Sequence, residues 1–86
     1  MMTTSNKNIG EIEALLVEHV VKKTGLAPAA IDHGQRFDHY GLDSADAVRM
    51  IGDIEDFVGR PLSATLPYKY PTIASLARRL ADGASD

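Results

Sequence analysis

The chain has 86 residues, of which 44% are hydrophobic and 24% are charged, and it contains no cysteine. This length fits one small globular domain and leaves too little chain for an enzyme with a deep, enclosed active site. The missing cysteine excludes disulfides, thiolate catalysis and cysteine-based zinc sites. A formal net charge of −3 argues against a nucleic-acid-binding protein, which normally presents a basic face.

The ends of the chain and its hydropathy bear on location. No apolar run reaches the length of a membrane span, and the first eight residues are too polar for a secretion signal. We therefore expect a soluble, cytoplasmic monomer that contacts neither membrane nor nucleic acid. We also expect flexible tails at residues 1–7 and 83–86 around one domain at 8–82, and a free-standing protein, because the chain begins with methionine and ends soon after its last predicted helix.

The first predicted element is an amphipathic helix from about Asn8 to Lys23, with Thr24-Gly25 as its stop. Its inward face has helical spacing and comprises Ile9, Ile12, Leu15, Leu16, His19 and Val20. A long connection follows, from Leu26 to Asp43. Loops of this length in compact domains are usually functional. We expect it to be pinned to the core by its apolar residues Leu26, Ile31, Phe37, Tyr40 and Leu42.

The remaining elements are also helical. A second helix is predicted from Ser44 to Val58, ended by Gly59, with Ala47, Val48, Ile51, Ile54 and Val58 inward and Asp46, Arg49, Asp53 and Asp56 on the solvent side. Pro61–Leu66 can form only a short turn, capped by Ser63. The last helix starts after Pro71 with Thr72 as its cap and buries Ile73, Leu76, Ala77 and Leu80. The fold class is thus all-α: a small four-helix bundle with three main helices, a short third helix and a long loop between the first two.

The pair Asp43-Ser44 stands where the long loop turns into the second helix. One interpretation is an ordinary helix cap, because Asp and Ser accept hydrogen bonds from the unpaired backbone N–H groups of a first turn. The other is that the partial positive charge of the helix N-terminus stabilises a phosphodiester built on the Ser44 hydroxyl. The motif alone does not decide between them.

Three short segments, in order and at matching spacing, resemble the acyl carrier proteins of the phosphopantetheine-binding family. They are Ile31-Asp32 followed by Phe37, then Tyr40-Gly41-Leu42-Asp43-Ser44, and finally Tyr70-Pro71-Thr72-Ile73 leading into Leu76-Ala77. The resemblance covers about Ile9 to Leu80 and is strongest to carriers of polyketide and mixed polyketide–peptide pathways. The stretch from Gly52 to Leu66 is similar to carriers that work beside adenylate-forming acyl ligases.

The resemblance implies that Ser44 receives a 4′-phosphopantetheine arm from coenzyme A through a phosphopantetheinyl transferase. It implies that Asp43 takes part in recognition by that transferase and in the metal-assisted transfer, without a resident metal site. The arm would hold acyl groups as thioesters, so the chain itself needs no catalytic residue and is not an enzyme. It would deliver them to polyketide or other secondary-metabolite enzymes.

The partners implied besides the transferase are an adenylate-forming ligase or acyltransferase and a ketosynthase or similar enzyme. We expect them to dock around the serine, on Leu42, Asp43, Ala45, Asp46, Arg49, Met50 and Asp53. Two positions depart from the family pattern. Ala45 stands where a larger apolar residue is usual and Arg49 where an acidic residue is common, which favours a dedicated partner set over generic fatty-acid enzymes.

Two other functions remain open at this point. The first is an aminoacyl or peptidyl carrier of a nonribosomal peptide pathway. The second is a carrier-like helical module that binds partners and is never modified, for which Ala45 is the best hint. A hydrolytic triad of Ser44 with His19, His33 or His39 has little support, because nothing in the sequence brings these residues together.

Overall fold

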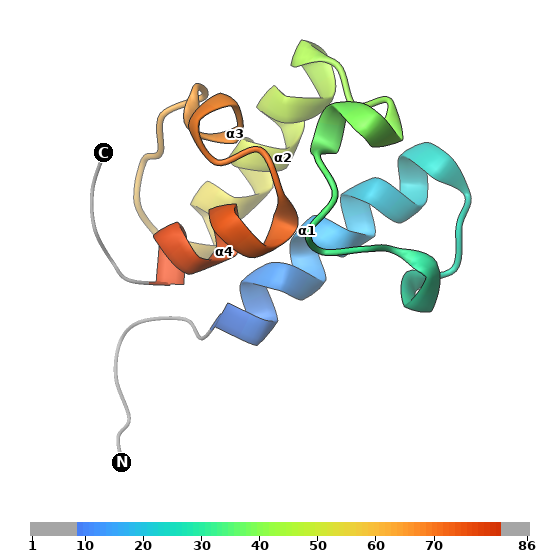
Figure 1. The fold of residues 1–86 in the computed structure, drawn as a ribbon. Coiled ribbons are helices and arrows are strands. Elements are labelled where there is room, and N and C mark those ends of the chain that lie inside the picture. The colour runs from blue at the N-terminus through green and yellow to red at the C-terminus, as the bar shows by residue number, and fades with distance from the viewer. Residues whose placement is uncertain (1–8, 82–86) are drawn as a thin grey trace.

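The computed structural model describes residues 9–81. Within this range, four α-helices and two short 3₁₀ helices follow one another (Figure 1): α1 (Ile9–Thr24), η1 (Pro28–Ala30), η2 (Phe37–Tyr40), α2 (Ser44–Val58), α3 (Leu66–Lys69) and α4 (Ile73–Ala81). Over the described range there is no β-strand, only one isolated antiparallel bridge. The predicted all-α bundle with a short third helix is confirmed. The expected tails at 1–7 and 83–86 lie outside the described residues.

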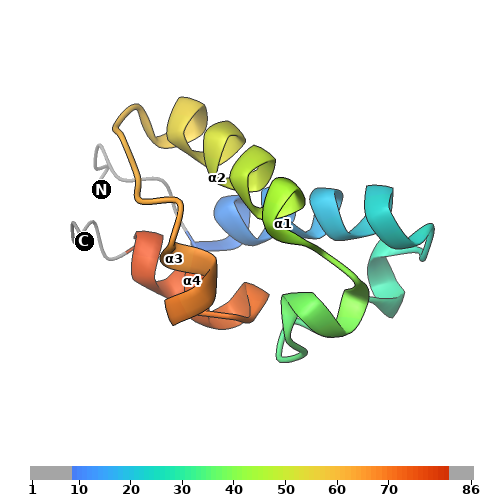
Figure 2. The same cartoon turned by 90° about the horizontal axis from the view of Figure 1, so that it is seen from above.

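Helix α1 is the central element, because it packs against both α2 and α4. Seen from above, it lies between them (Figure 2). It buries Ile12, Leu16 and Val20, one residue per turn of the same face. It ends at Gly25, whose φ of 77° is the left-handed conformation that glycine adopts without strain. The prediction was wrong for Ile9, which is 39% exposed because it begins the helix, ahead of the buried stripe.

Helix α2 begins and ends where the sequence predicts. Its buried residues are Ala47, Met50, Ile51 and Ile54, which form one continuous helical stripe. Val48 was expected to face inward but is 56% exposed, because it is rotated about one residue away from that stripe. Met50, by contrast, is fully buried.

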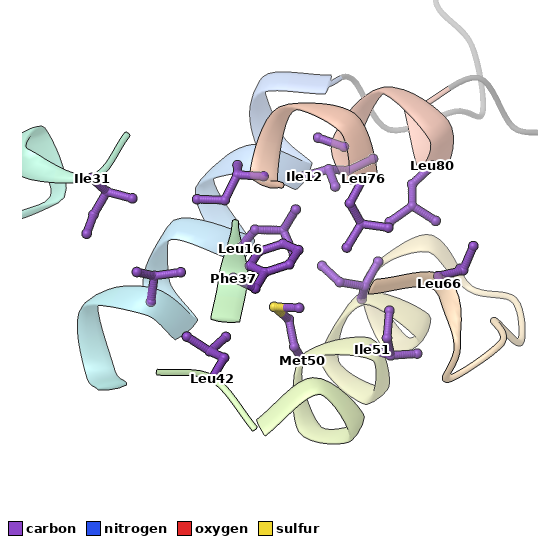
Figure 3. Close-up of a cluster of buried hydrophobic side chains, with 14 residues drawn as sticks. Ile12, Leu16, Ile31, Phe37, Leu42, Met50, Ile51, Leu66, Leu76 and Leu80 are labelled. Carbon is purple, nitrogen blue, oxygen red and sulfur yellow. The ribbon is translucent and has the colours of Figure 1, made fainter. Parts of the chain in front are cut away.

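The core collects side chains from all four α-helices and from the long connection. Figure 3 shows Met50 of α2 among Leu16, Phe37 and Leu42. Each fully buried aliphatic or sulfur-containing side chain of this size contributes roughly 1.5–3 kcal/mol to folding through removal of apolar surface from water. This one continuous core explains how the domain is stable without disulfides.

The connection between α1 and α2 is tied to the start of α4 by backbone hydrogen bonds. The Phe37 N–H donates to the Pro71 carbonyl at 2.8 Å, and the Ala74 N–H donates to the His33 carbonyl at 2.9 Å. As predicted, the loop is pinned by its buried or partly buried residues Ile31, Phe37, Tyr40 and Leu42. Leu26 is 42% exposed, so the prediction was wrong there; it directly follows the left-handed turn at Gly25, which ends α1 before the chain reaches the core.

The third helix was expected at Pro61–Leu66 but lies later, at Leu66–Lys69. Leu66 is 1% exposed, and Pro67 in the first turn needs no N–H partner, so burial places the helix here. Ser63 accepts a hydrogen bond from the Thr65 N–H at 3.2 Å and caps no helix.

Helix α4 matches its prediction. The Thr72 hydroxyl accepts from the Ser75 N–H at 3.0 Å, while the Ser75 hydroxyl accepts from the Thr72 N–H at 3.2 Å. This reciprocal cap starts the helix. The helix then buries Ile73, Leu76, Ala77 and Leu80. In the stretch from residue 9 to 81, no helix is long and apolar enough to cross a membrane.

Candidate functional site at the start of α2

Ser44 is the first residue of α2, and its side chain is exposed. Within the described part of the chain its hydroxyl makes no hydrogen bond. The oxygen therefore stands in solvent at a helix N-terminus, where unpaired backbone N–H groups and the helix dipole favour negative charge. Ser44 is thus open to solvent at the start of α2.

The helix cap is Asp43. Its Oδ1 accepts a hydrogen bond from the Asp46 N–H at 2.9 Å, and Asp46 Oδ2 accepts one from the Asp43 N–H at 3.1 Å. Together these bonds form a capping box, which explains why α2 starts at Ser44. Of the pair Asp43-Ser44, Asp43 therefore caps the helix, and the Ser44 hydroxyl is not used for capping.

Gly41 and Leu42 fix the approach to the cap. Gly41 has a φ of 84°, and its N–H donates to the Asp38 carbonyl at 3.0 Å. A residue with a Cβ would be strained in this left-handed conformation. Leu42 is only 9% exposed and anchors the segment in the core. The left-handed turn at Gly41 and the burial of Leu42 therefore fix the backbone just before the exposed Ser44.

Asp46 is held by contacts on both sides. Its carboxylate lies 3.0 Å from Lys23 Nζ of α1 and 3.1 Å from an Arg49 guanidinium nitrogen, and its side chain is 19% exposed. The hydrogen bond from the Asp43 backbone, followed by the bond with Lys23, lowers the pKa of Asp46 from 3.8 to about 2. The carboxylate expected on the solvent side is thus engaged within the chain.

A hollow of about 240 Å³ opens beside Ser44 and reaches α3. Arg36 and Tyr68 line it together with the serine, and Tyr68 is 65% exposed. Arg36 is paired with Asp38 at 3.1 Å, and this pairing lowers the pKa of Asp38. Sequence reasoning did not name Arg36 or Tyr68 as site residues. The only signal in the sequence was an aromatic residue, Tyr68, directly after Pro67 in the short segment before the last predicted helix.

The site is chemically suited to a phosphodiester with a flexible arm. The exposed hydroxyl supplies the attachment atom, the N-terminus of α2 favours the negative phosphate, and the hollow beside it leaves room for the arm. Arg36 on the wall of the same hollow is balanced by Asp38, which lines it as well.

The other residues expected to contact partners fall into two groups. Ala45, Arg49 and Asp53 are exposed, although Asp53 also lies 2.7 Å from His19 Nε2. Leu42 is 9% exposed and Met50 is fully buried, so both belong mainly to the core, and their contact with partners stays a prediction.

None of the three histidines is hydrogen-bonded to Ser44 in the part of the chain that is described. His19 contacts Asp53, His33 lies 3.6 Å from Glu13, and His39 packs edge-on against Tyr40. Among residues 9–81, no group of three His, Cys, Asp or Glu side chains is arranged to hold a metal ion. The arrangement gives a hydrolytic triad no support.

Comparison with known proteins agrees with this geometry. Residues 14–80 match the family described as "Phosphopantetheine attachment site". The chain is 30% identical over 80 residues to one of the phenolphthiocerol/phthiocerol polyketide synthase proteins of Mycobacterium tuberculosis. The match covers 93% of this chain but only 4% of that much longer protein.

Two solved structures share the fold. A free-standing peptidyl carrier protein from an uncharacterized secondary metabolic pathway of Acinetobacter baumannii is 38% identical, with a TM-score of 0.80 over 91% of this chain and 98% of that one. An acyl carrier protein from Anabaena with a variant phosphopantetheinylation-site sequence is 33% identical, with a TM-score of 0.80 over 95% and 93% of the two chains. Since the family match spans most of the chain, this protein belongs to the phosphopantetheine-binding carrier family, whose domain is the site of covalent 4′-phosphopantetheine attachment.

Proposed function

We propose that Ser44 bears the 4′-phosphopantetheine arm and that the protein carries acyl intermediates on it as thioesters. The observation that carries the proposal is the exposed, unbonded hydroxyl at the first residue of α2, next to a separate capping residue. The arm supplies a thiol, which this chain lacks because it has no cysteine. The chain itself binds the arm, positions it and presents it to other enzymes.

In the proposed modification, the Ser44 oxygen attacks the phosphorus of coenzyme A that bears the pantetheine. The bond from that phosphorus to the adenosine 3′,5′-diphosphate leaving group breaks, and the serine proton passes to a base of the transferase. Asp43 directly precedes Ser44 in the chain, and the oxygen that it gives to the capping box is Oδ1. A carboxylate there is suited to face the divalent ion that phosphoryl transfer requires, while the helix N-terminus favours the product phosphodiester.

The proposed partners are a phosphopantetheinyl transferase, an adenylate-forming ligase or acyltransferase, and a ketosynthase or a similar biosynthetic enzyme. The likeness to part of a polyketide synthase supports this set. A tethered thioester raises the effective concentration of the acyl group at each docked active site, so successive enzymes can share one carrier. Contacts near Ser44 must then be modest enough for exchange.

A second candidate is an aminoacyl or peptidyl carrier. The specific observation in its favour is the 38% identity to the free-standing peptidyl carrier protein from Acinetobacter baumannii, which this chain matches over nearly that protein's full length. The two candidates separate when the arm-bearing protein is offered to adenylate-forming ligases with fatty, β-amino and α-amino acids. The thioester that forms, identified by mass, assigns the class of cargo.

The modification itself is tested with coenzyme A and a broad-specificity phosphopantetheinyl transferase, followed by intact mass measurement. We expect the wild-type protein to gain the mass of one phosphopantetheinyl group and Ser44→Ala to gain none. Ser63→Ala is the matched control, because Ser63 is also exposed but caps no helix, and it should be modified like the wild type. No gain on the wild type, or an equal gain on Ser44→Ala, would refute the proposal and favour an unmodified interaction module.

A further inference from the structure

The hollow of about 240 Å³ beside Ser44 is the place where the candidate site meets the core. Its rim carries exposed residues, namely Arg36, Asp38, Asp43, Ser44 and Tyr68. Its floor, by contrast, consists of buried side chains, namely Phe37, Leu42, Ala47, Met50 and Pro67. An arm attached at the rim is therefore separated from the interior of the domain only by this apolar floor.

Met50 closes the inner end of the hollow. It borders the hollow and is nevertheless 0% exposed, so it is enclosed by its neighbours even where the surface is concave. Figure 3 shows its side chain in the middle of the core, among Leu16, Phe37 and Leu42. The unbranched thioether side chain of methionine fills irregular gaps well. Met50 thus stands between the hollow and the packed core that α1 and α2 share.

The size of the hollow limits what can enter it. Pockets that enclose a drug-sized ligand measure roughly 300–1,000 Å³, and this hollow is smaller, at about 240 Å³. Because the arm starts at Ser44 on the rim, the part of the arm next to the phosphate reaches the hollow first. An acyl chain at the far end of the arm would need further space beyond Met50, where the interior is close-packed.

We propose that Met50 is a plug that keeps the carried acyl chain out of the core, so that the chain stays in solvent at the end of the arm. This inference rests on the proposed function and names the residue that decides how the cargo is presented. Partner enzymes then receive the chain without extracting it from the carrier. Shortening Met50 joins the hollow to a cavity in the core, where an apolar chain is stabilised by leaving water.

The test compares acyl chains of different length on the same full-length protein. A broad-specificity phosphopantetheinyl transferase with acetyl-, butyryl- or octanoyl-coenzyme A attaches each acylated arm in one step, and intact mass verifies the products. We then measure the midpoint temperature of thermal unfolding and the rate of thioester cleavage by hydroxylamine, divided by the rate for the same acyl-coenzyme A. For the wild type, both quantities should be the same for all three chains.

Met50→Ala keeps the Cβ and removes the rest of the plug. We expect its octanoyl form to unfold about 5 °C above its acetyl form, because a chain that fills the cavity binds only the folded state. Hydroxylamine should cleave the octanoyl thioester of this variant about fivefold more slowly than its acetyl thioester, since burial of the chain shields the sulfur. Met50→Val, which leaves a smaller cavity, should change both quantities in the same direction by less.

Ile54→Ala is the matched control. Ile54 is also 0% exposed and lies one turn further along α2, but it does not line the hollow. This variant also gains a cavity in the core, so its acetyl form should be destabilised in the same way. Neither its unfolding temperature nor its thioester cleavage should depend on the length of the chain.

Three outcomes would overturn the inference. They are protection of the octanoyl chain in the wild type, no dependence on chain length in Met50→Ala, and an equal dependence in Ile54→Ala. Circular dichroism checks that each variant folds; if Met50→Ala does not, Met50→Val and the wild type decide. Absence of any mass gain on the wild type is a different failure, because it refutes attachment of the arm itself.

Discussion

The first turn of α2 and the turns that follow it are built in different ways. The first turn is held by polar contacts at the surface: the reciprocal cap of Asp43 and Asp46 and the ion pairs of Asp46 with Lys23 and Arg49. The following turns are held by burial, with Met50 and Ile54 fully enclosed. One helix thus joins a polar, accessible end to an apolar, inaccessible body.

This difference separates the site from the core. The proposed attachment atom contributes nothing to packing, since Ser44 is exposed and unbonded in the described range. Conversely, the residues of the buried stripe are almost entirely enclosed, and Ala47, the most exposed of them, is only 7% exposed. We therefore expect substitutions in the body of α2 to change stability, and substitutions in its first turn to change recognition.

The largest expected effect is in the body of the helix. Ile54→Ala should lower the free energy of unfolding by about 2–5 kcal/mol, because it removes fully buried methyl groups and leaves a cavity. Urea unfolding followed by circular dichroism measures the change. Under conditions where the variant is still folded, its rate of modification at Ser44 should match the wild type. A selective loss of modification would contradict the separation of site and core.

The cap should give the next largest effect. Asp43→Ala should lower the free energy of unfolding by about 1 kcal/mol, because the Asp46 N–H loses its acceptor. Asp43→Asn keeps the cap and should change it by only a few tenths of a kcal/mol, roughly, since Asn is as good an N-cap. If the carboxylate assists the transfer, both variants should be modified slowly. Fast modification of Asp43→Asn would assign Asp43 to capping alone.

The Asp46 carboxylate should leave a signature in the pH dependence of stability. Its pKa is lowered from 3.8 to about 2 in the folded chain, so the folded state binds its proton more weakly than the unfolded state. Its stabilising contribution is fully present above pH ~4 and is lost as the pH falls through about 2. The midpoint temperature of thermal unfolding should therefore fall less steeply between pH 5 and pH 2 for Asp46→Asn than for the wild type. Parallel curves would show that neither the hydrogen bond from the Asp43 backbone nor the bond with Lys23 makes the charged carboxylate stabilising.

The smallest effect on stability should come from Val48. Val48→Ala should change the free energy of unfolding by less than about 0.5 kcal/mol, because the side chain is already 56% exposed. Chemical denaturation of this variant beside Ile54→Ala gives the sharpest contrast between the two sides of α2. A large loss of stability would show that Val48 is part of the core after all.

Local signals in the sequence predicted the bounds of α2 well. Asp43 before the helix and Gly59 after it are strong boundary residues, and both boundaries are confirmed. The buried face of α4 was also predictable, because its apolar residues recur at helical spacing next to the Thr72 cap. These features depend on neighbours within one or two turns.

The errors arose where tertiary packing decides. Val48 was assigned inward because it is apolar, but the position of α1 against α2 selects the adjacent stripe. The short helix is predicted at Pro61–Leu66 but forms at Leu66–Lys69, because the Leu66 side chain is buried in the core. The pairs His19–Asp53 and Lys23–Asp46 join separate helices, and no local pattern predicts such contacts.

The hydrogen bonds from the α1–α2 connection to residues 71–74 have a consequence for synthesis of the chain. The Phe37 N–H and the His33 carbonyl are paired with the Pro71 carbonyl and the Ala74 N–H. A nascent chain whose synthesis has not reached Pro71 and Ala74 lacks the partners of these hydrogen bonds. The segment that leads to Gly41 is then not yet held in place. The proposed attachment of the arm to Ser44 would then require synthesis of nearly the whole domain, so unfinished chains would not be modified.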